Sequence, residues 1–142
     1  GQLDELFWLI ESMVKAQDAD ALYLYSCFSL PEWKESNEEF EKRSMELLVL
    51  SANAGIPEAL YKLGLLYNVG DGVEKNSEKA FSFFKTAAEK GHFGAKLSYG
   101  LDLFYGLNGV ITDKGLGLDF IKQAADENVE GASNMLKKLL NT

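Results

Sequence analysis

Apolar and small residues recur along the chain with the spacing of helical faces. In the segment 58–68, a rotation of about 100° per residue separates the side chains into two sets on opposite sides of a helix. The set that we expect to face the core is Ala59, Leu63, Gly64 and Tyr67. The set on the opposite side is Tyr61, Leu65 and Asn68. Similar spacing elsewhere predicts helices throughout the chain.

The helical pattern is repeated at a fixed interval. The segment 59–67 recurs in outline at 95–103, and each copy leads into a glycine-containing turn and a second helical pattern. Ala59 and Ala95 are 36 residues apart, whereas Ala95 and Ala132 are 37 apart. A weaker copy begins at Ala21, 38 residues before Ala59. One hairpin cannot bury its apolar face alone, so this period predicts stacked helical hairpins.

Local signals set the expected ends of the second helices. Asn76 and Asp113 offer side-chain oxygens that can accept the first amide hydrogens, and Gly91 suits a helix C-terminus. We therefore expect second helices at about 77–90 and 113–127.

Two glycines inside the expected first helices have the same place in the repeat. Glycine within a helix costs about 1 kcal/mol relative to alanine. The recurrence of Gly64 as Gly100 therefore predicts that a neighbouring helix axis passes close to both residues.

These signals divide the chain into one repeat domain, 1–142, with five parts. They are an N-terminal helix at 1–20, a degenerate repeat at 21–58, repeats at 59–94 and 95–131, and a capping helix at 132–142. The last segment begins like a new first helix, but Lys137 and Lys138 give it a polar outer face, which is typical of a solubilising cap.

Composition is that of a single soluble domain. The chain has 142 residues, of which 46% are hydrophobic, and no run approaches the roughly 20 apolar residues that span a bilayer. We expect a monomer with no membrane insertion. The chain opens on Gly1 without an initiator methionine, so we expect a processed or shortened start, and both cytoplasm and periplasm remain open as the compartment.

Net charge narrows the class of partner. A formal charge of −8 disfavours binding to nucleic acid and to anionic lipid, and a basic protein fits better. The segment 32–41 holds five glutamates and one lysine, and these charged residues lie on both sides of Trp33. We expect a solvated linker and helix start there, with a recognition site around Trp33 as the sharper alternative.

Candidate chemistry is sparse. The only cysteine, Cys27, has apolar neighbours and is expected to be buried, and the only histidine, His92, is 65 positions away in another hairpin. One of each cannot supply a zinc site or a disulfide. The pair Gly70 and Gly72 follows a helix and lacks the lysine of a phosphate loop. We expect no catalytic residue, no cofactor and no metal.

The repeated residues resemble a known family. The string Ala59-x-Tyr61-x-Leu63-Gly64-x-x-Tyr67-x-x-Gly70-x-Gly72-Val73, followed by Lys79-Ala80-x-x-Phe83-Phe84-x-x-Ala87-Ala88-Glu89-x-Gly91-His92-x-x-Ala95, is similar to the Sel-one-like repeat (SLR) family, a relative of the tetratricopeptide repeats. The match continues more weakly to Ala132, where Leu116-Gly117 replaces the Lys-Ala pair and Asn128 replaces the glycine. It is degenerate from 21 to 55, where Ser26 stands at the helix glycine.

This resemblance implies a fold and a class of function. The implied fold is all-α: a right-handed α/α superhelix, here with about three hairpins, an N-terminal helix and a C-terminal cap. Members of the family act as non-enzymatic adaptors or scaffolds, with a concave surface lined by the first helices. The candidate partner-binding residues are Tyr23, Tyr61, Leu65, Asn68, Leu97, Leu101, Phe104 and Trp33. Tyr61 belongs to the family pattern, so a purely structural role as cement between helices is an equal alternative.

Three functions remain open from the sequence. The first is a protein-interaction module that binds an unidentified protein partner on its concave or acidic surface. The second is a bacterial inhibitor or immunity protein that neutralises a basic toxin, which predicts salt-sensitive binding. The third is a structural segment of a longer solenoid.

Overall fold

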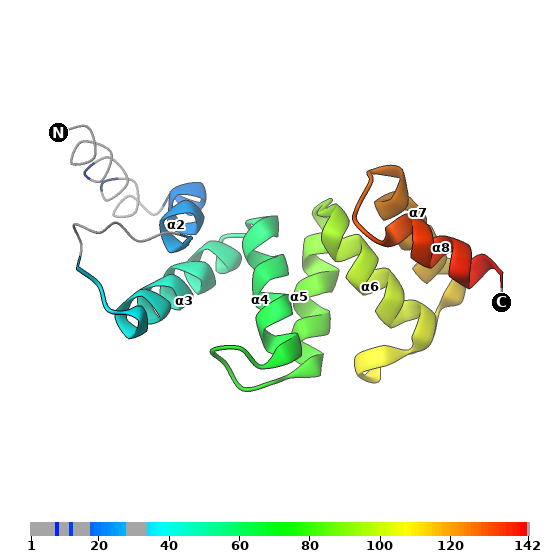
Figure 1. The fold of residues 1–142 in the computed structure, drawn as a ribbon, viewed down its shortest axis with the longest axis horizontal. Helices are drawn as coiled ribbons and strands as arrows, with labels where there is room; N and C mark the ends of the chain where they lie inside the picture. The colour runs from blue at the N-terminus through cyan, green and yellow to red at the C-terminus, as the bar shows by residue number, and fades with distance from the viewer. Residues whose placement is uncertain (1–7, 9–11, 13–17, 28–33, 142) are drawn as a thin grey trace. The chain divides into compact units, whose positions relative to one another are not determined.

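The computed structural model describes residue 8, residue 12 and the ranges 18–27 and 34–141. Within these residues every regular element is a helix, which confirms the expected all-α fold. The helices are α2 (Ala19–Ser26), α3 (Asn37–Asn53), α4 (Pro57–Val69), α5 (Ser77–Glu89), α6 (Phe93–Tyr105), the 3-10 turn η2 (Leu107–Gly109), α7 (Lys114–Asp126) and α8 (Ala132–Leu140). Figure 1 shows them in chain order. Most of the predicted N-terminal helix, and Trp33, lie outside the described residues.

The chain forms two compact units, Gly1–Ala59 and Leu60–Thr142. In the first unit α2 packs against α3. Ser36 begins α3 with a reciprocal cap, because its hydroxyl accepts from the Glu39 amide at 3.1 Å and lies 3.1 Å from the Glu39 carboxylate. The expected helix start in the acidic segment is therefore present.

An arginine clamp ties the two helices of the first unit together. Arg43 donates two hydrogen bonds to the Glu35 carboxylate, at 2.7 and 3.0 Å, and a third to the Tyr25 carbonyl oxygen at 2.6 Å. The Arg43 and Glu35 side chains are only 19% and 12% exposed. Glu35 was expected to be solvated with its acidic neighbours, but this bidentate pair withdraws it from water.

Ser26 keeps the role of a small residue in the degenerate repeat. It stands at the register of Gly64 and Gly100 and is fully buried. Its carbonyl oxygen accepts a 2.6 Å hydrogen bond from the Ser44 hydroxyl on α3.

The expectation that Cys27 is buried was wrong. The cysteine follows the last residue of α2, and its thiol is exposed and donates to the Tyr23 carbonyl oxygen at 3.2 Å. The preceding residue, Ser26, is buried instead.

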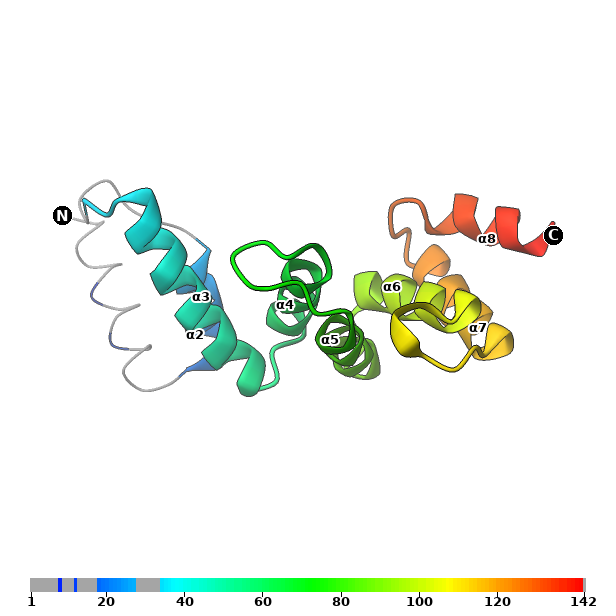
Figure 2. The same ribbon diagram turned by 90° about the horizontal axis from the view of Figure 1, so that it is seen from below.

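Helix α4, most of which belongs to the second unit, contacts α5 through the ring pairs Tyr61–Phe84 and Tyr67–Phe83. Helix α6 pairs with α7, and α8 lies against α7 (Figures 1 and 2). Helix α5 also packs on α6. The side chains buried between these helices include Leu60, Leu63, Ala80, Phe84, Ala87, Ala88, Ala95, Tyr99, Leu103, Ile121, Ala124, Ala132 and Leu139. The predicted core positions Leu63 and Gly64 are buried, and Tyr67 is half-buried.

Three helices end with the same backbone geometry at the repeat interval. Gly55, Gly91 and Asn128 adopt positive φ values of 92°, 93° and 59°. The amide after each donates to a carbonyl five residues back: Ile56 to Ser51, His92 to Ala87 and Val129 to Ala124, at 3.1, 3.0 and 3.0 Å. These are the bonds of a left-handed helix terminus. Gly91 ends α5 as predicted, and Asn128 fills the same role for α7.

The predicted N-caps are also in place. The Asn76 side chain accepts from the Lys79 amide at 3.0 Å, and the Asp113 side chain accepts from the Leu116 amide at 3.0 Å. Both therefore satisfy an amide hydrogen that has no partner within its helix.

The two helix glycines accommodate different neighbours. A Cβ on Gly100 would lie 2.8 Å from the Gly117 carbonyl oxygen on α7, as expected for two close helix axes. A Cβ on Gly64 would instead lie 2.6 Å from the Phe84 ring on α5. Gly64 therefore makes room for a side chain, whereas Gly100 makes room for a backbone.

Helix α8 has the register of a first helix, with Ala132 and Leu139 buried. Lys137 is exposed and stands where α4 and α6 have Gly64 and Gly100. The capping role of α8, like the proposed limits of the repeats, stays a prediction. None of the described helices is long and apolar enough to cross a membrane.

Candidate protein-binding surface on the first helices

The first helices of the second unit expose large apolar side chains. On α4 these are Leu65 and Val69, and on α6 they are Phe93 and Tyr105. Val69 is the most open of the four, at 68% exposed. We call these four residues the first-helix surface.

The second helices expose a different chemistry. The open positions of α5 are Glu78, Lys79, Ser82, Lys85 and Glu89. Those of α7 are Lys114, Gly115, Leu116, Asp119, Lys122 and Asp126. All but one of these residues are polar, charged or glycine. Among helices α4 to α7, the exposed large apolar side chains therefore lie mainly on α4 and α6.

The predicted site residues divide by burial. Leu65 and Asn68 are exposed, as an accessible surface requires. Half-buried positions are taken by Tyr23 in the first unit and by Tyr61, Leu97, Leu101 and Phe104 in the second. Their role in binding stays a prediction.

Tyr61 makes contacts that favour its structural role. Its ring stacks on the His92 ring, with centroids 4.5 Å apart and planes 27° apart, and lies 5.8 Å from the Phe84 ring. His92 in turn caps α6, because its Nδ1 accepts from the Ala95 amide at 3.0 Å. Tyr61 thus joins α4 to α5 and to the start of α6.

Two aromatic residues of α6 lie beside lysine side chains. Lys96 Nζ lies 4.7 Å from the centroid of Phe93 and donates to Gln123 Oε1 at 2.8 Å. Lys114 Nζ lies 5.5 Å from the centroid of Phe104. These cations cover part of each ring, within the range of cation–π attraction.

Sequence reasoning missed Val69, Phe93 and Tyr105. Each lies at the end of a first helix, outside the part of the repeat whose phase was used to assign faces. Val69 and Tyr105 immediately precede Gly70 and Gly106. A large apolar residue next to a turn glycine was the available signal.

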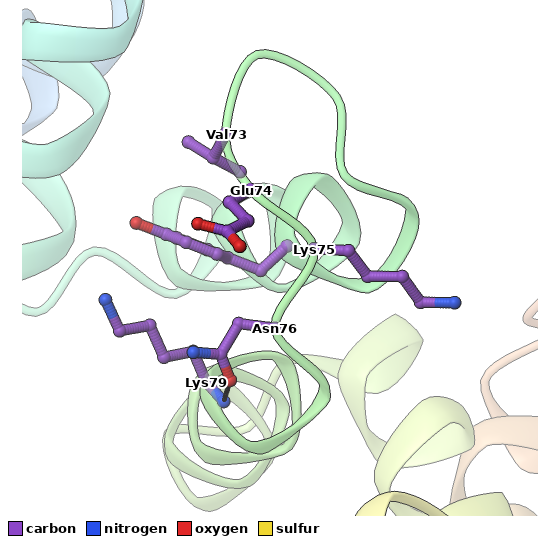
Figure 3. A pocket seen from close by; sticks show the side chains of 6 residues that line it. Val73, Glu74, Lys75, Asn76 and Lys79 are labelled. Atoms are coloured by element: carbon purple, nitrogen blue, oxygen red, sulfur yellow. Dashed lines mark hydrogen bonds between the residues drawn. The ribbon is translucent and has the colours of Figure 1, made fainter.

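A small depression lies beside the turn between α4 and α5. Its volume is about 440 Å³, and its lining residues are Tyr67, Val73, Glu74, Lys75, Asn76 and Lys79. Lys79 Nζ lies 5.2 Å from the centroid of Tyr67. Figure 3 shows Lys75 and Lys79 extending in opposite directions, so the two cations do not converge on one ligand.

Two buried titratable groups lie on α6. Burial raises the pKa of Tyr99, whose ring lies between Phe81 and Phe120 at centroid distances of 5.4 and 5.1 Å. Burial also raises the pKa of Asp102, against a smaller opposing effect of its hydrogen bond from Asn108. Oδ2 of Asp102 has no hydrogen-bond partner.

Among the described residues, these groups are not part of a metal-binding cluster. Within 18–27 and 34–141, together with residues 8 and 12, no three His, Cys, Asp or Glu side chains lie close enough to hold a metal ion. Tyr99 packs against the rings of Phe81 and Phe120, and Asp102 Oδ1 accepts a hydrogen bond from the Asn108 side-chain amide. Their environments are those of packed core groups.

Solved structures similar to this chain are SLR proteins. A Sel1 repeat protein from Oxalobacter formigenes is 26% identical and covers 93% of this chain and 97% of its own, with a TM-score of 0.82. A protective antigen of uropathogenic Escherichia coli that displays an SLR fold is also 26% identical, with a TM-score of 0.67, covering 84% of this chain and 25% of its own. Cysteine rich protein B of Helicobacter pylori shares the fold, at 17% identity and a TM-score of 0.64, covering 89% of this chain and 94% of its own.

Similarity to curated proteins extends to a eukaryotic regulator. Chitin synthase regulatory factor 2 of Schizosaccharomyces pombe is 31% identical over 96 residues, which are 67% of this chain. The match spans only 18% of the length of that protein. Two segments of this chain, 57–92 and 95–129, match the Sel1 repeat itself. They coincide with the hairpins α4–α5 and α6–α7, and the chain therefore belongs to the Sel1 repeat family.

Proposed function

We propose that this chain is a non-enzymatic protein-interaction module that binds its partner through the first-helix surface. Sel1 repeat proteins generally mediate protein–protein interactions. The observation that carries the proposal is the separation of exposed chemistry: apolar side chains on α4 and α6, and mostly charged ones on α5 and α7. An exposed apolar surface with a polar rim is typical of a protein-binding site.

Two further observations support a binding role. The curated relative is named as a regulatory factor of an enzyme, which fits a protein that acts by contact. The charge of −8 favours a partner with a basic surface, which would also accelerate association.

Substitutions at matched exposed helix positions test the surface. Leu65→Asp and Val69→Asp each add one negative charge to α4, and Ser82→Asp adds the same charge to the exposed face of α5. With the chain as bait in an extract of its source cells, we expect the same partner to be recovered by the wild type and Ser82→Asp. Both α4 variants should lose most of it.

Circular dichroism of all three variants establishes that the helices are intact. Equal recovery by Leu65→Asp, Val69→Asp and the wild type would contradict the assignment of the surface. Turnover of a substrate by the purified chain would contradict the non-enzymatic role.

A further inference from the structure

The two turns of the second unit share one frame. In the hairpin α4–α5 the Asn76 amide donates to the Tyr67 carbonyl oxygen at 2.9 Å. In α6–α7 the Asp113 amide donates to the Leu103 carbonyl oxygen at 2.8 Å, at the corresponding positions. The second turn contains one extra residue, which we assign to Asn108 because its backbone is left-handed, whereas neither Asp71 nor Leu107 has a positive φ. The side chains of the two turns can therefore be compared position by position.

The α6–α7 turn has apolar residues at two positions where the α4–α5 turn has acidic residues. Leu107 occupies the position of Asp71, and Ile111 occupies that of Glu74. Leu107 is 46% exposed and Ile111 is 90% exposed. Fully exposed isoleucine is unfavourable in water, and the matching turn shows that the frame accepts charged residues there. The exchange is thus a property of this turn and not a demand of the hairpin.

The apolar turn has hydrogen bonds in addition to the one that it shares with the α4–α5 turn. Three of the four turn positions 106–109 have left-handed backbones, with φ of 66° at Gly106, 57° at Asn108 and 77° at Gly109. The Asn108 side-chain amide donates to Asp102 Oδ1 at 3.1 Å, and the Val110 amide donates to the Leu107 carbonyl oxygen at 3.1 Å. The conformation that presents Leu107 and Ile111 is therefore set before any partner binds.

The residue that holds Asn108 is unusual for its place in the repeat. Asp102 is 6% exposed, whereas its register positions in α4 and α8 are Leu66 and Leu139. Burying a carboxylate in place of leucine is unfavourable. The buried Asp102 carboxylate accepts the hydrogen bond from Asn108, and this hydrogen bond holds the apolar turn in place.

We propose that Leu107 and Ile111 form a second, preformed contact of the binding module: an apolar anchor that inserts into an apolar cleft, bordered by basic side chains, on a protein partner. This inference rests on the proposed function but uses residues outside the first-helix surface. A rigid anchor loses little conformational entropy on binding, and a few apolar residues in a desolvated cleft often dominate affinity.

Charge favours a protein partner over an anionic membrane or a second copy of this chain as the molecule that the anchor contacts. The segment 97–121 contains Lys114 as its only basic residue, whereas binding to an anionic bilayer calls for several lysines or arginines around an apolar anchor. A second copy of the chain would bring together two molecules of charge −8. Asp113 and Asp119 lie close in sequence to the anchor and suit a basic rim on the partner.

A photo-crosslinking experiment on the full chain addresses the contact directly. The apolar photoreactive residue benzoylphenylalanine replaces Ile111, or Glu74 in the matching turn as the control. In source cells we expect a protein adduct from position 111 that position 74 does not give. The crosslink should map to an apolar segment of the adduct protein that has lysine or arginine beside it. An adduct with lipid or with a second copy of the chain, or the same adducts from both positions, would overturn the proposal.

The captured protein is then purified and titrated. Leu107→Asp with Ile111→Glu gives the anchor the side chains of the other turn, so the frame is preserved. We expect this double variant to weaken binding by about tenfold or more. Asp71→Leu with Glu74→Ile, the reciprocal change, should leave affinity within about twofold. Equal affinity of wild type and the Leu107→Asp, Ile111→Glu variant would refute the anchor. If Leu65→Asp still abolished binding in that case, the proposed function would stand without it.

Discussion

Gly100 and Gly117 each occupy the space that a Cβ of the other would need. A Cβ on Gly117 would lie 2.7 Å from the Gly100 carbonyl oxygen, and one on Gly100 would lie 2.8 Å from the Gly117 carbonyl oxygen. Helices α6 and α7 therefore meet backbone to backbone at this pair. A backbone cannot move aside as a side chain can, so this contact fixes the separation of the two helices.

We expect Gly100→Ala and Gly117→Ala each to destabilise the second unit by about 1–3 kcal/mol through overpacking. The intrinsic helix preference of alanine offsets part of this loss. Gly64→Ala should have a smaller effect, because the Phe84 ring can shift, and Phe84→Leu should rescue it. Urea denaturation followed by circular dichroism gives the free energy of unfolding of each variant. A larger loss for Gly64→Ala than for Gly117→Ala would contradict the distinction between the two glycines.

Asp102 predicts a pH dependence of stability. Its folded pKa is raised above the ordinary value of 3.8 by burial, so the folded state binds the proton more tightly than the unfolded state. The carboxylate therefore destabilises the fold above its raised pKa, and this penalty disappears as the pH falls through that pKa toward the ordinary value.

Asp102→Asn removes the charge and keeps an acceptor for Asn108. We expect the variant to be more stable than the wild type at pH 7, with the difference shrinking toward pH 4. Urea midpoints of both proteins across this range measure the difference. A constant difference at all pH values would show that Asp102 does not titrate as its burial requires.

Arg43 is expected to decide the stability of the first unit. Arg43→Met removes the hydrogen bonds that Arg43 donates to the Glu35 carboxylate and the Tyr25 carbonyl oxygen. Hydrogen bonds to charged groups contribute about 1.5–3 kcal/mol. Arg43→Lys keeps the charge but loses the planar fork, so it should restore only part of the stability.

Tryptophan fluorescence separates this effect from the rest of the chain. Both tryptophans, Trp8 and Trp33, belong to the first unit, so any change of tryptophan emission during unfolding comes from that unit. The Arg43→Met transition should move to lower urea concentration by fluorescence. If Arg43→Lys proved as stable as the wild type, the bidentate geometry of the Arg43–Glu35 pair would not contribute to stability.

His92 combines two contacts that substitution can separate. His92→Ala loses both the cap on the Ala95 amide and the stack on Tyr61, whereas His92→Asn keeps a capping oxygen and loses the stack. Loss of an N-cap costs about 1 kcal/mol. We expect His92→Asn to lie between the wild type and His92→Ala in melting temperature, measured by circular dichroism. Identical melting of the two variants would assign the whole effect to the stack.

Local signals made the hairpins predictable. Asn76, Asp113 and Gly91 act within a few residues of themselves, so their roles could be inferred from sequence neighbours alone. Asn128 replaces a glycine but tolerates the same left-handed backbone, which is why the weaker repeat keeps its helix end. The core face of α4 followed from periodicity for the same reason.

Features that depend on distant residues were not predictable in this way. The Arg43 clamp joins α3 to the Tyr25 carbonyl across 18 positions. Gly117 looked like a departure from the Lys-Ala pair, but it is the residue that lets α7 approach Gly100. Ile111 has the composition of a core residue, and only comparison of the two turns in three dimensions shows that it is fully exposed. The candidate binding residues were predicted from the helical phase of the repeat. Helical phase cannot show whether Tyr61 is exposed or, as the structure has it, half-buried and stacked on His92.

The matching helix ends at Gly55, Gly91 and Asn128 affect how a gene for such a protein can gain or lose repeats. The backbone bonds that define each end stay within six consecutive residues. A recombination event between the codons for Gly91 and Asn128 would add or delete one hairpin in frame and would restore an equivalent chain reversal at the junction. Copy number in this family can therefore vary by whole hairpins, with the glycine-like positions serving as natural crossover points.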